Sequence, residues 1–289
     1  MKELVYQTDW FEKMRLFFVV SNSYKIKMNQ SCIARVLSGC LVPALCMAAA
    51  GAAAEEKLSI GNDNLSQCEV VSSLNNFKQS PADFRIYFIG DSITRHGFNK
   101  ETIAKLKWDH VAGMAASSDA KDYANLLAAD IRKYLPDKKV RMFFGRGGDS
   151  ANALKGMDDA ARYQPQLVVV QLGEHVQAKD SREKISGDYA ALLDALKMLS
   201  SKPLIVCTGV WDPQTGLKKY SGRTALIEEV QREVCLQKNI PFASVEKYAL
   251  DPGCRGAGGS NGVRWHPNDA GHTGYARELF ALFKEHCPQ

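Results

Sequence analysis

Short apolar runs alternate with amphipathic segments along most of this chain, and this alternation limits the fold more than any other feature. The runs are rich in β-branched and aromatic residues, a composition typical of strands buried on both faces of a parallel sheet. They lie at 86–89, 140–144, 167–170 and 204–207, with a weaker run at 241–245. The segments with helical spacing lie at 122–134, 189–199, 224–236 and 270–283. The alternation predicts an α/β fold in which helices cover both faces of a parallel sheet of about five strands.

The N-terminal region has the three-part layout of a secretory signal peptide. From Met28 the sequence has a short polar start with Arg35, an apolar stretch at 36–50 and a tract of small residues that ends at Ala54. This layout predicts a signal peptide at 28–54 that is cleaved near Ala54, so that residues 1–54 are absent from the mature protein. We therefore expect the protein to be secreted or periplasmic.

Three other interpretations of this region are weaker. The apolar stretch is shorter than the roughly 20 residues that cross a bilayer, so no stable membrane anchor is expected. Cys40 ends a tetrapeptide that looks like a lipobox, but the apolar residues mostly follow this cysteine instead of preceding it, which disfavours a lipoprotein. A cytosolic protein with an alanine-rich tail is the remaining alternative.

The rest of the chain is predicted to form a polar, irregular lead-in segment at 55–83 and one domain at 84–289. A mature chain of roughly 230 residues can bury a core that folds without disulfides or metals. The formal net charge is only +5, and no run of Lys and Arg is interleaved with aromatics, so no nucleic-acid partner is expected. Five cysteines follow the alanine tract; their spacing matches no zinc-binding pattern, and their pairing in an exported protein cannot be read from sequence: Cys68, Cys207, Cys235, Cys254 and Cys287.

Candidate catalytic residues are sought where the predicted strands end, because ligands of parallel α/β sheets bind at the carboxyl ends of the strands. The first run is followed by Gly90, Asp91 and Ser92 on a tight turn. A serine exposed there is a candidate nucleophile if a base lies beside it. The alternative is a helix-capping serine, since all three residue types favour such turns.

The second run leads into a glycine-rich segment at 145–150 that includes Gly148. Glycines let backbone N–H groups approach a ligand closely, so this segment can donate hydrogen bonds to an oxyanion. A flexible turn and a phosphate-binding loop are the alternatives, although the Gly-Lys-Ser/Thr ending of a P-loop is missing. The third run is followed by Gly173, Glu174 and His175.

A histidine near the C-terminus is the candidate base. His266 precedes Pro267, which holds it in extended backbone just before a helix that is expected to begin at about Asn268. His272 falls inside that helix and is expected to be structural. Glu174 and Asp269 would be a candidate pair of glycosidase carboxylates, but no spacing supports that interpretation.

Taken together, these four places resemble, in order and spacing, the four sequence blocks of the SGNH (GDSL-like) hydrolases. The blocks are the Ser92 turn, Gly148, the Gly173 segment and His266-Pro267-Asn268, and the resemblance covers about residues 84–285. It implies a three-layer flavodoxin-like fold, no cofactor, and hydrolysis of esters or thioesters. It also implies that Ser92 is the nucleophile, that His266 is its base, and that the backbone N–H groups of Ser92 and Gly148 bind the oxyanion.

The sequence departs from the family pattern at two positions. His175 stands where the family usually has an asparagine that donates to the oxyanion, and an imidazole N–H can take over this role. Val263 stands where the family has the aspartate that orients the histidine. We therefore expect a Ser-His dyad in which His266 is oriented by a backbone carbonyl near Val263 or by a supporting carboxylate from elsewhere, with Asp91 and Asp251 as candidates.

These observations predict an exported serine esterase that acts on a small ester. An O-acetyl ester of a carbohydrate is the favoured substrate, because three tryptophans fall in or beside the strand-end loops, although a tryptophan that serves only the core is equally common: Trp108, Trp211 and Trp265. Short-chain lipid and aryl esters are close competitors. The alternatives are an O-acetyltransferase that acts on a glycan and a degenerate glycan-binding domain without activity.

Overall fold

The computed structural model describes residues 68–287, so the predicted signal peptide at 28–54 lies outside the described residues. The described chain is built on one six-stranded sheet in which all neighbouring strands are parallel. The order across the sheet is β1-β3-β2-β4-β5-β6. The strands are β1 (Cys68–Val70), β2 (Asp83–Ile89), β3 (Lys139–Phe144), β4 (Leu167–Gln171), β5 (Leu204–Thr208) and β6 (Phe242–Ala243). The predicted α/β class and the five predicted strands are confirmed.

The sixth strand corrects the prediction that the lead-in segment at 55–83 is irregular. β1 lies inside that segment and pairs in parallel with β3, with Cys68 opposite Val140. Its three residues are too few to show a strand period in the sequence, and only the exposed edge of β3 gives them a partner.

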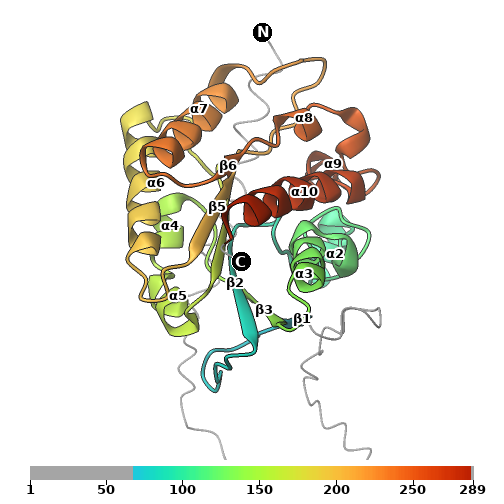
Figure 1. The fold of residues 1–289 in the computed structure, drawn as a ribbon. Helices are drawn as coiled ribbons and strands as arrows, with labels where there is room; N and C mark the ends of the chain where they lie inside the picture. The colour runs from blue at the N-terminus through green and yellow to red at the C-terminus, as the bar shows by residue number, and fades with distance from the viewer. Residues whose placement is uncertain (1–67, 288–289) are drawn as a thin grey trace, which may run out of the picture. The chain divides into compact units, whose positions relative to one another are not determined.

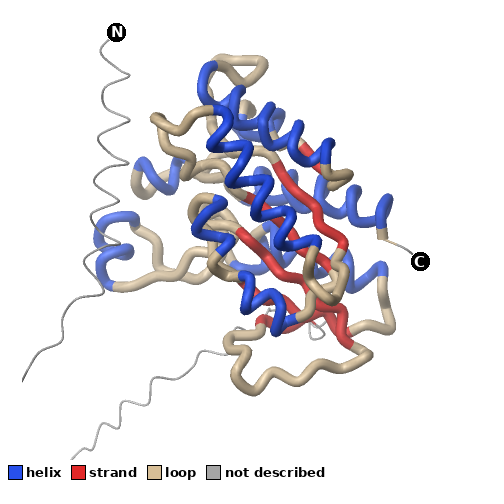
Figure 2. Tube along the Cα trace, turned by 90° about the vertical axis from the view of Figure 1, so that its left-hand side faces the viewer, coloured by secondary structure: helices blue, strands red, loops and turns tan. Residues whose placement is uncertain are grey.

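Two layers of helices cover the sheet (Figures 1 and 2). α3 (Tyr123–Tyr134) and α10 (Asp269–His286) pack against each other on one face. The other face carries α4 (Ser150–Leu154), α5 (Met157–Tyr163), α6 (Arg182–Lys197) and α7 (Gly222–Gln237). The four predicted helices are present, and α6 begins earlier than expected because its first turns carry few apolar residues.

The central strands bring the ends of distant segments together. Every residue of β2 and β4 is buried, as expected for strands with helices on both faces. Ile89 lies opposite Val170, and Phe88 lies opposite Phe144. The three segments that follow these strands therefore leave the sheet side by side, at its carboxyl edge.

Short helices surround this edge. The insertion between β2 and α3 holds α2 (Lys100–Leu106) and the 3-10 turn η2 (Asp119–Lys121), and α8 (Glu246–Ala249), η3 (Pro252–Cys254) and α9 (Asn261–Trp265) precede α10. No disulfide joins Cys68, Cys207, Cys235 and Cys254. Over residues 68–287, none of the helices has the length and apolar character needed to cross a bilayer.

Candidate active site

Ser92 lies on a tight turn directly after β2. The carbonyl of Asp91 accepts hydrogen bonds from the N–H groups of Thr94 and Arg95, at 2.9 and 2.8 Å, which closes the turn. The Ser92 carbonyl accepts a hydrogen bond from the Met114 N–H at 2.7 Å, and the side chain is partly exposed. The Ser92 N–H has no hydrogen-bond acceptor among residues 68–287.

His266 reaches Ser92 from the far end of the chain. It directly follows α9 in extended backbone, with φ −77° and ψ 160°, as expected for a residue before proline. Its ring nitrogen Nε2 lies 2.6 Å from Ser92 Oγ, and its Nδ1 lies 2.6 Å from the carbonyl oxygen of Gly262. A carbonyl only accepts, so the proton of the neutral ring is on Nδ1, and the free lone pair of Nε2 faces the serine hydroxyl.

A backbone carbonyl therefore occupies the place of the missing aspartate. The acceptor belongs to Gly262, next to Val263, which matches one of the two alternatives from the sequence. The other alternative is wrong for Asp251, because this exposed carboxylate instead caps η3 and accepts the Gly253 N–H at 2.8 Å. The ring of His266 is thus oriented by its own chain segment.

Burial sets the protonation state of this histidine. His266 is buried, and desolvation lowers the pKa of its imidazole to about 3, although the Gly262 carbonyl works in the opposite direction. The ring is therefore neutral at pH 7 and able to accept a proton. The same low pKa makes it a weak base, because the cation gains no carboxylate partner.

The glycine-rich segment after β3 packs against the Ser92 turn. A Cβ on Gly147 would lie 2.2 Å from the Gly90 carbonyl oxygen, so only glycine fits there. Gly148 has φ +99°, a conformation that other residues rarely adopt. This close approach brings the Gly148 N–H to the Asp91 carboxylate, where it favours the charged form.

Asp91 and His175 form a second polar pair beside Ser92. His175 Nε2 lies 3.3 Å from Asp91 Oδ2, and the His175 side chain is 44% exposed. Burial raises the pKa of the Asp91 carboxyl, and the His175 ring opposes this shift. The structure thus brings Gly148 and His175 to the side chain of Asp91, the residue that precedes Ser92.

The matching family model covers residues 88–273, which is more than half of the chain, and describes the GDSL-like Lipase/Acylhydrolase family. The chain belongs to this family. It is a hydrolase that acts on ester bonds. No curated protein matches the chain.

Solved structures show the same fold at low sequence identity. A protein from Parabacteroides merdae described as a GDSL-like lipase is 15% identical, covers 70% of this chain and 96% of its own, and has a TM-score of 0.53. An α/β hydrolase from the metagenome of Lake Arreo in Spain is 16% identical with the same coverage and a TM-score of 0.52. A family two carbohydrate esterase from Clostridium thermocellum reaches only 0.47, at 18% identity over 72% of this chain and 65% of its own. At these identities the likeness shows the fold alone.

The second histidine of the C-terminal segment is structural in this GDSL-like hydrolase, as expected from its place inside the helix. His272 is fully buried in α10. Its Nδ1 accepts the Tyr123 N–H at 3.3 Å, and its Nε2 lies 3.2 Å from the Met114 carbonyl oxygen. Both ring nitrogens are thus used by the protein itself.

The structure separates the two carboxylates that the sequence offered as a glycosidase pair. The Glu174 carboxyl accepts hydrogen bonds from Gln171 and from the Trp211 N–H in the interior. Asp269 instead accepts the N–H and the hydroxyl of Ser117, both at 2.7 Å. The two groups serve different elements and do not face a common substrate site.

The three candidate tryptophans differ in their surroundings. Trp211 is fully buried in the main core, whereas Trp108 is 3% exposed, belongs to a small separate cluster and lines the cavity described below. Trp265 is partly exposed, and its ring lies edge to face against the His266 ring at 5.1 Å between centroids. An aromatic surface beside the base is therefore provided by this residue.

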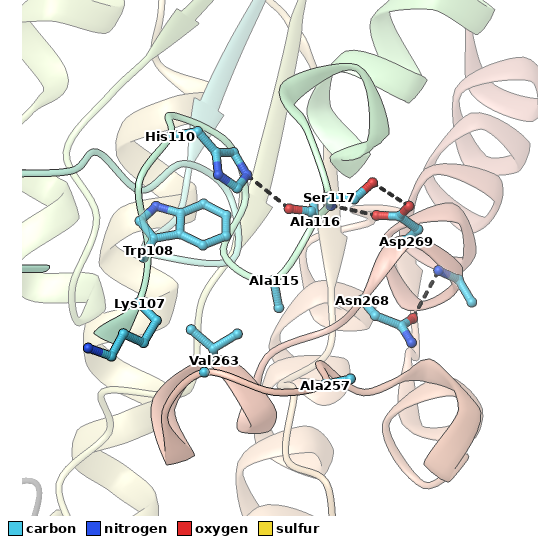
Figure 3. A pocket seen from close by; sticks show the side chains of 12 residues that line it. Lys107, Trp108, His110, Ala115, Ala116, Ser117, Ala257, Val263, Asn268 and Asp269 are labelled. Carbon is cyan, nitrogen blue, oxygen red and sulfur yellow. Dashed lines mark hydrogen bonds between the residues drawn. The ribbon is translucent and has the colours of Figure 1, made fainter. Parts of the chain in front are cut away.

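A cavity of about 590 Å³ lies beside the active site, between the insertion loop and the segment before α10 (Figure 3). Its lining includes Lys107, Trp108 and His110 on one side and Val263 and Asp269 on the other. Neither Ser92 nor His266 lines it. The reacting atoms thus lie outside this cavity, which adjoins the helix that carries the Gly262 carbonyl.

Several residues that hold the site together carry no signal in the sequence. The Gly262 carbonyl and the Met114 N–H are backbone groups, which no residue pattern reveals. Gln171 directly follows a predicted strand and Trp211 was a candidate ligand surface, and their contacts with Thr94, Glu174 and Trp265 include partners that are 37 to 77 positions away in the chain.

Proposed function

We propose that this GDSL-like hydrolase is an exported serine esterase that cleaves small carboxylic esters with a Ser92–His266 dyad. The single observation that carries the proposal is the 2.6 Å contact between Ser92 Oγ and His266 Nε2, with Nδ1 fixed by Gly262. This contact places the nucleophile and a neutral base within the range needed for proton transfer.

In the first half-reaction the ester acylates the serine. Ser92 Oγ attacks the acyl carbon while its proton moves to His266 Nε2, and the carbonyl electrons move onto the oxygen. The tetrahedral intermediate then collapses, the bond to the alcohol breaks, and the alcohol leaves with the proton from Nε2. The acyl group stays on Ser92 as an ester.

Water reverses these steps in the second half-reaction. His266 Nε2 takes a proton from water as its oxygen adds to the acyl carbon. Collapse of the second intermediate breaks the bond to Ser92 Oγ, which recovers its proton from Nε2. The acid is released, and the dyad returns to its starting state.

The oxyanion of both intermediates is proposed to bind beside Asp91. The Ser92 N–H lacks an acceptor among the described residues, and the Gly148 N–H and the His175 ring lie near the Asp91 carboxyl. Binding of an oxyanion requires that the Gly148 N–H turns from Asp91 to the ligand, whereas His175 Nε2 lies 3.3 Å from Asp91 Oδ2 without a hydrogen bond to it. Asp91 then acts as a support that holds both donors near Ser92.

The proposed substrate is an O-acetyl ester of a carbohydrate. Partly exposed polar groups, Asp91 and His175, surround the serine, and the Trp265 ring beside the base offers a face on which a sugar can stack. The predicted signal peptide would bring the enzyme to the periplasm or the exterior, where glycans are found. The Trp265 ring would also suit an aryl ester, so the polar pair of Asp91 and His175 is what favours a sugar.

Covalent labelling tests the catalytic proposal directly. A fluorophosphonate should label the wild-type chain on Ser92, and peptide mapping should find no label in Ser92→Ala. The variant should keep its thermal unfolding midpoint and lose turnover of a chromogenic acetyl ester. Label on another residue, or turnover retained by Ser92→Ala, would move the nucleophile elsewhere.

Acyl-chain length and acceptor dependence test the substrate. Initial rates on acetyl, butyryl and octanoyl aryl esters should fall with chain length, and acetylated oligosaccharides should release acetate. A preference for the octanoyl ester would favour a lipid substrate. Transfer of the acetyl group to an added oligosaccharide, detected by mass spectrometry, would instead identify an O-acetyltransferase.

A further inference from the structure

Glu174 has a buried carboxyl group for which the proposed dyad has no use. Its Oε1 accepts two hydrogen bonds, from Gln171 Nε2 at 2.8 Å and from the Trp211 N–H at 2.7 Å. Burial raises the pKa of this carboxyl to about 8, and no salt bridge within residues 68–287 compensates it. With this pKa the carboxyl is mostly protonated at pH 7, and the two hydrogen bonds that Oε1 accepts offset the cost of burying a polar group.

One branch of this network leads to the nucleophile. Gln171 Oε1 accepts the Thr94 hydroxyl at 3.2 Å, and the Thr94 Oγ1 lies 2.7 Å from the Tyr123 hydroxyl. Thr94, Gln171 and Tyr123 are all buried. Thr94 belongs to the turn closed by the Asp91 carbonyl, so this branch fixes the backbone that carries Ser92.

The other branch leads to the base. Trp211 is fully buried, and its indole Nε1–H donates to the Trp265 carbonyl at 2.7 Å. Trp265 is the last residue of α9 and directly precedes His266. The carbonyl that orients the His266 ring, that of Gly262, lies in the same five-residue helix.

We propose that Glu174 is a positioning residue that holds the turns of Ser92 and His266 in register through Thr94, Gln171, Trp211 and Trp265. The proposal rests on the dyad proposed above. It assigns to a buried, mostly neutral carboxyl group, acting through backbone and side-chain hydrogen bonds, part of the orienting task that a third triad member performs by direct contact.

His266 needs such support because the Gly262 carbonyl alone holds its ring only weakly. A carbonyl in a short helix orients His266 only as well as that helix is held, and the segment before it contains Gly258 and Gly259 with positive φ. The indole of Trp211 ties the other end of α9 to the interior. A small displacement of this helix would lengthen the 2.6 Å contact between Ser92 and His266, and misplacement by about 1 Å can cost a hundredfold in rate.

Three variants separate positioning from stability. Trp211→Phe removes the indole N–H while it keeps an aromatic ring in the core, and Glu174→Gln keeps an oxygen that can accept both hydrogen bonds, whereas Glu174→Ala does not. We expect kcat to fall about tenfold or more in Trp211→Phe and Glu174→Ala, with KM changed less than about twofold. Glu174→Gln should recover most of kcat, and the rate of fluorophosphonate labelling of Ser92 should follow kcat.

Asp83→Asn is the matched control. Asp83 is also a buried carboxylate, paired with Arg141, but it lies at the start of β2, at the opposite edge of the sheet. This variant should lower the unfolding midpoint and leave kcat and the labelling rate unchanged. If Trp211→Phe and Glu174→Ala both keep wild-type kcat and labelling rate and lose only stability, as this control does, the positioning proposal is wrong.

Failure of the dyad itself gives a different result. In that case wild-type Ser92 would not be labelled, or Ser92→Ala would keep its turnover, whatever the other variants do. Should Glu174→Ala not fold, the comparison of Trp211→Phe with Glu174→Gln and Asp83→Asn decides the proposal.

Discussion

His266 and His272 lie six residues apart and share most of their physical properties, yet only one of them faces a reactive group. Both are buried, burial lowers the pKa of both rings, to about 3 and about 4, and both place one ring nitrogen at a backbone carbonyl. The difference lies in the other nitrogen. In His266 it faces the Ser92 hydroxyl, whereas in His272 it accepts a backbone N–H from Tyr123.

This comparison teaches that burial and a shifted pKa do not by themselves mark a catalytic histidine. A low pKa follows from desolvation in either setting. What distinguishes a base is a free lone pair that points at an exchangeable proton. In His272 that lone pair accepts the Tyr123 N–H, and the other ring nitrogen contacts the Met114 carbonyl. The ring therefore joins α10 to the start of α3 and to the loop that contains Met114.

The largest expected difference between the two histidines is in activity. His266→Ala should lower kcat about 10⁴-fold on a chromogenic acetyl ester, because the serine then has no base. His272→Ala should lower it less than about tenfold, through a small displacement of the Met114 loop. Steady-state kinetics of the two purified variants measures both, and equal losses would show that the comparison is wrong.

A third histidine, His175, sharpens the comparison because it is partly exposed. If it donates to the oxyanion, His175→Ala should lower kcat about a hundredfold with little change in KM, since the oxyanion exists mainly in the transition state. His175→Asn should keep or raise kcat, because an amide N–H restores the donor. An unchanged rate in His175→Ala would leave two donors, the N–H groups of Ser92 and Gly148.

The loss of stability should be larger in His272→Ala than in His266→Ala, the opposite of the order expected for activity. His272→Ala leaves a cavity and removes the partners of the Tyr123 N–H and the Met114 carbonyl, which should cost about 2–4 kcal/mol in the free energy of unfolding. His266→Ala removes a contact with one carbonyl at the edge of the site and should cost less. Urea denaturation at pH 7 measures the two costs, and a larger loss in His266→Ala would contradict the structural role of His272.

The smallest expected effect is in the pH dependence of stability. Folding lowers the pKa of His272 from 6.5 to about 4, so the unfolded chain binds more protons between these values, and stability from this group is lost as the pH falls below 6.5. The advantage of the wild type over His272→Ala should therefore shrink by about 1–2 kcal/mol between pH 7 and pH 5. Denaturation of both proteins at the two pH values provides the test.

Much of the fold could be predicted because its signals are local. The fully buried β2 and β4 appear in the sequence as continuous apolar runs. α10 is indicated by the helical spacing of its apolar residues and by Asn268, whose side chain caps its first turn. β1 could not be predicted, since three residues form a strand only when β3 offers them an open edge. The extended backbone of His266 followed from Pro267 alone, because the ring of proline restricts the residue before it.

The sequence by itself determined the α/β class, the turn that exposes Ser92 and the identity of the candidate base, since apolar period, glycine and proline act over a few residues. Only the tertiary structure decided between Asp251 and a backbone carbonyl as the partner of His266, and placed Trp211, a candidate ligand surface, in the core. It also tied Glu174 to Trp211 across 37 positions of the chain. Hydrogen-bond partners and burial depend on which distant segments pack together. Residue spacing and residue type do not predict that packing.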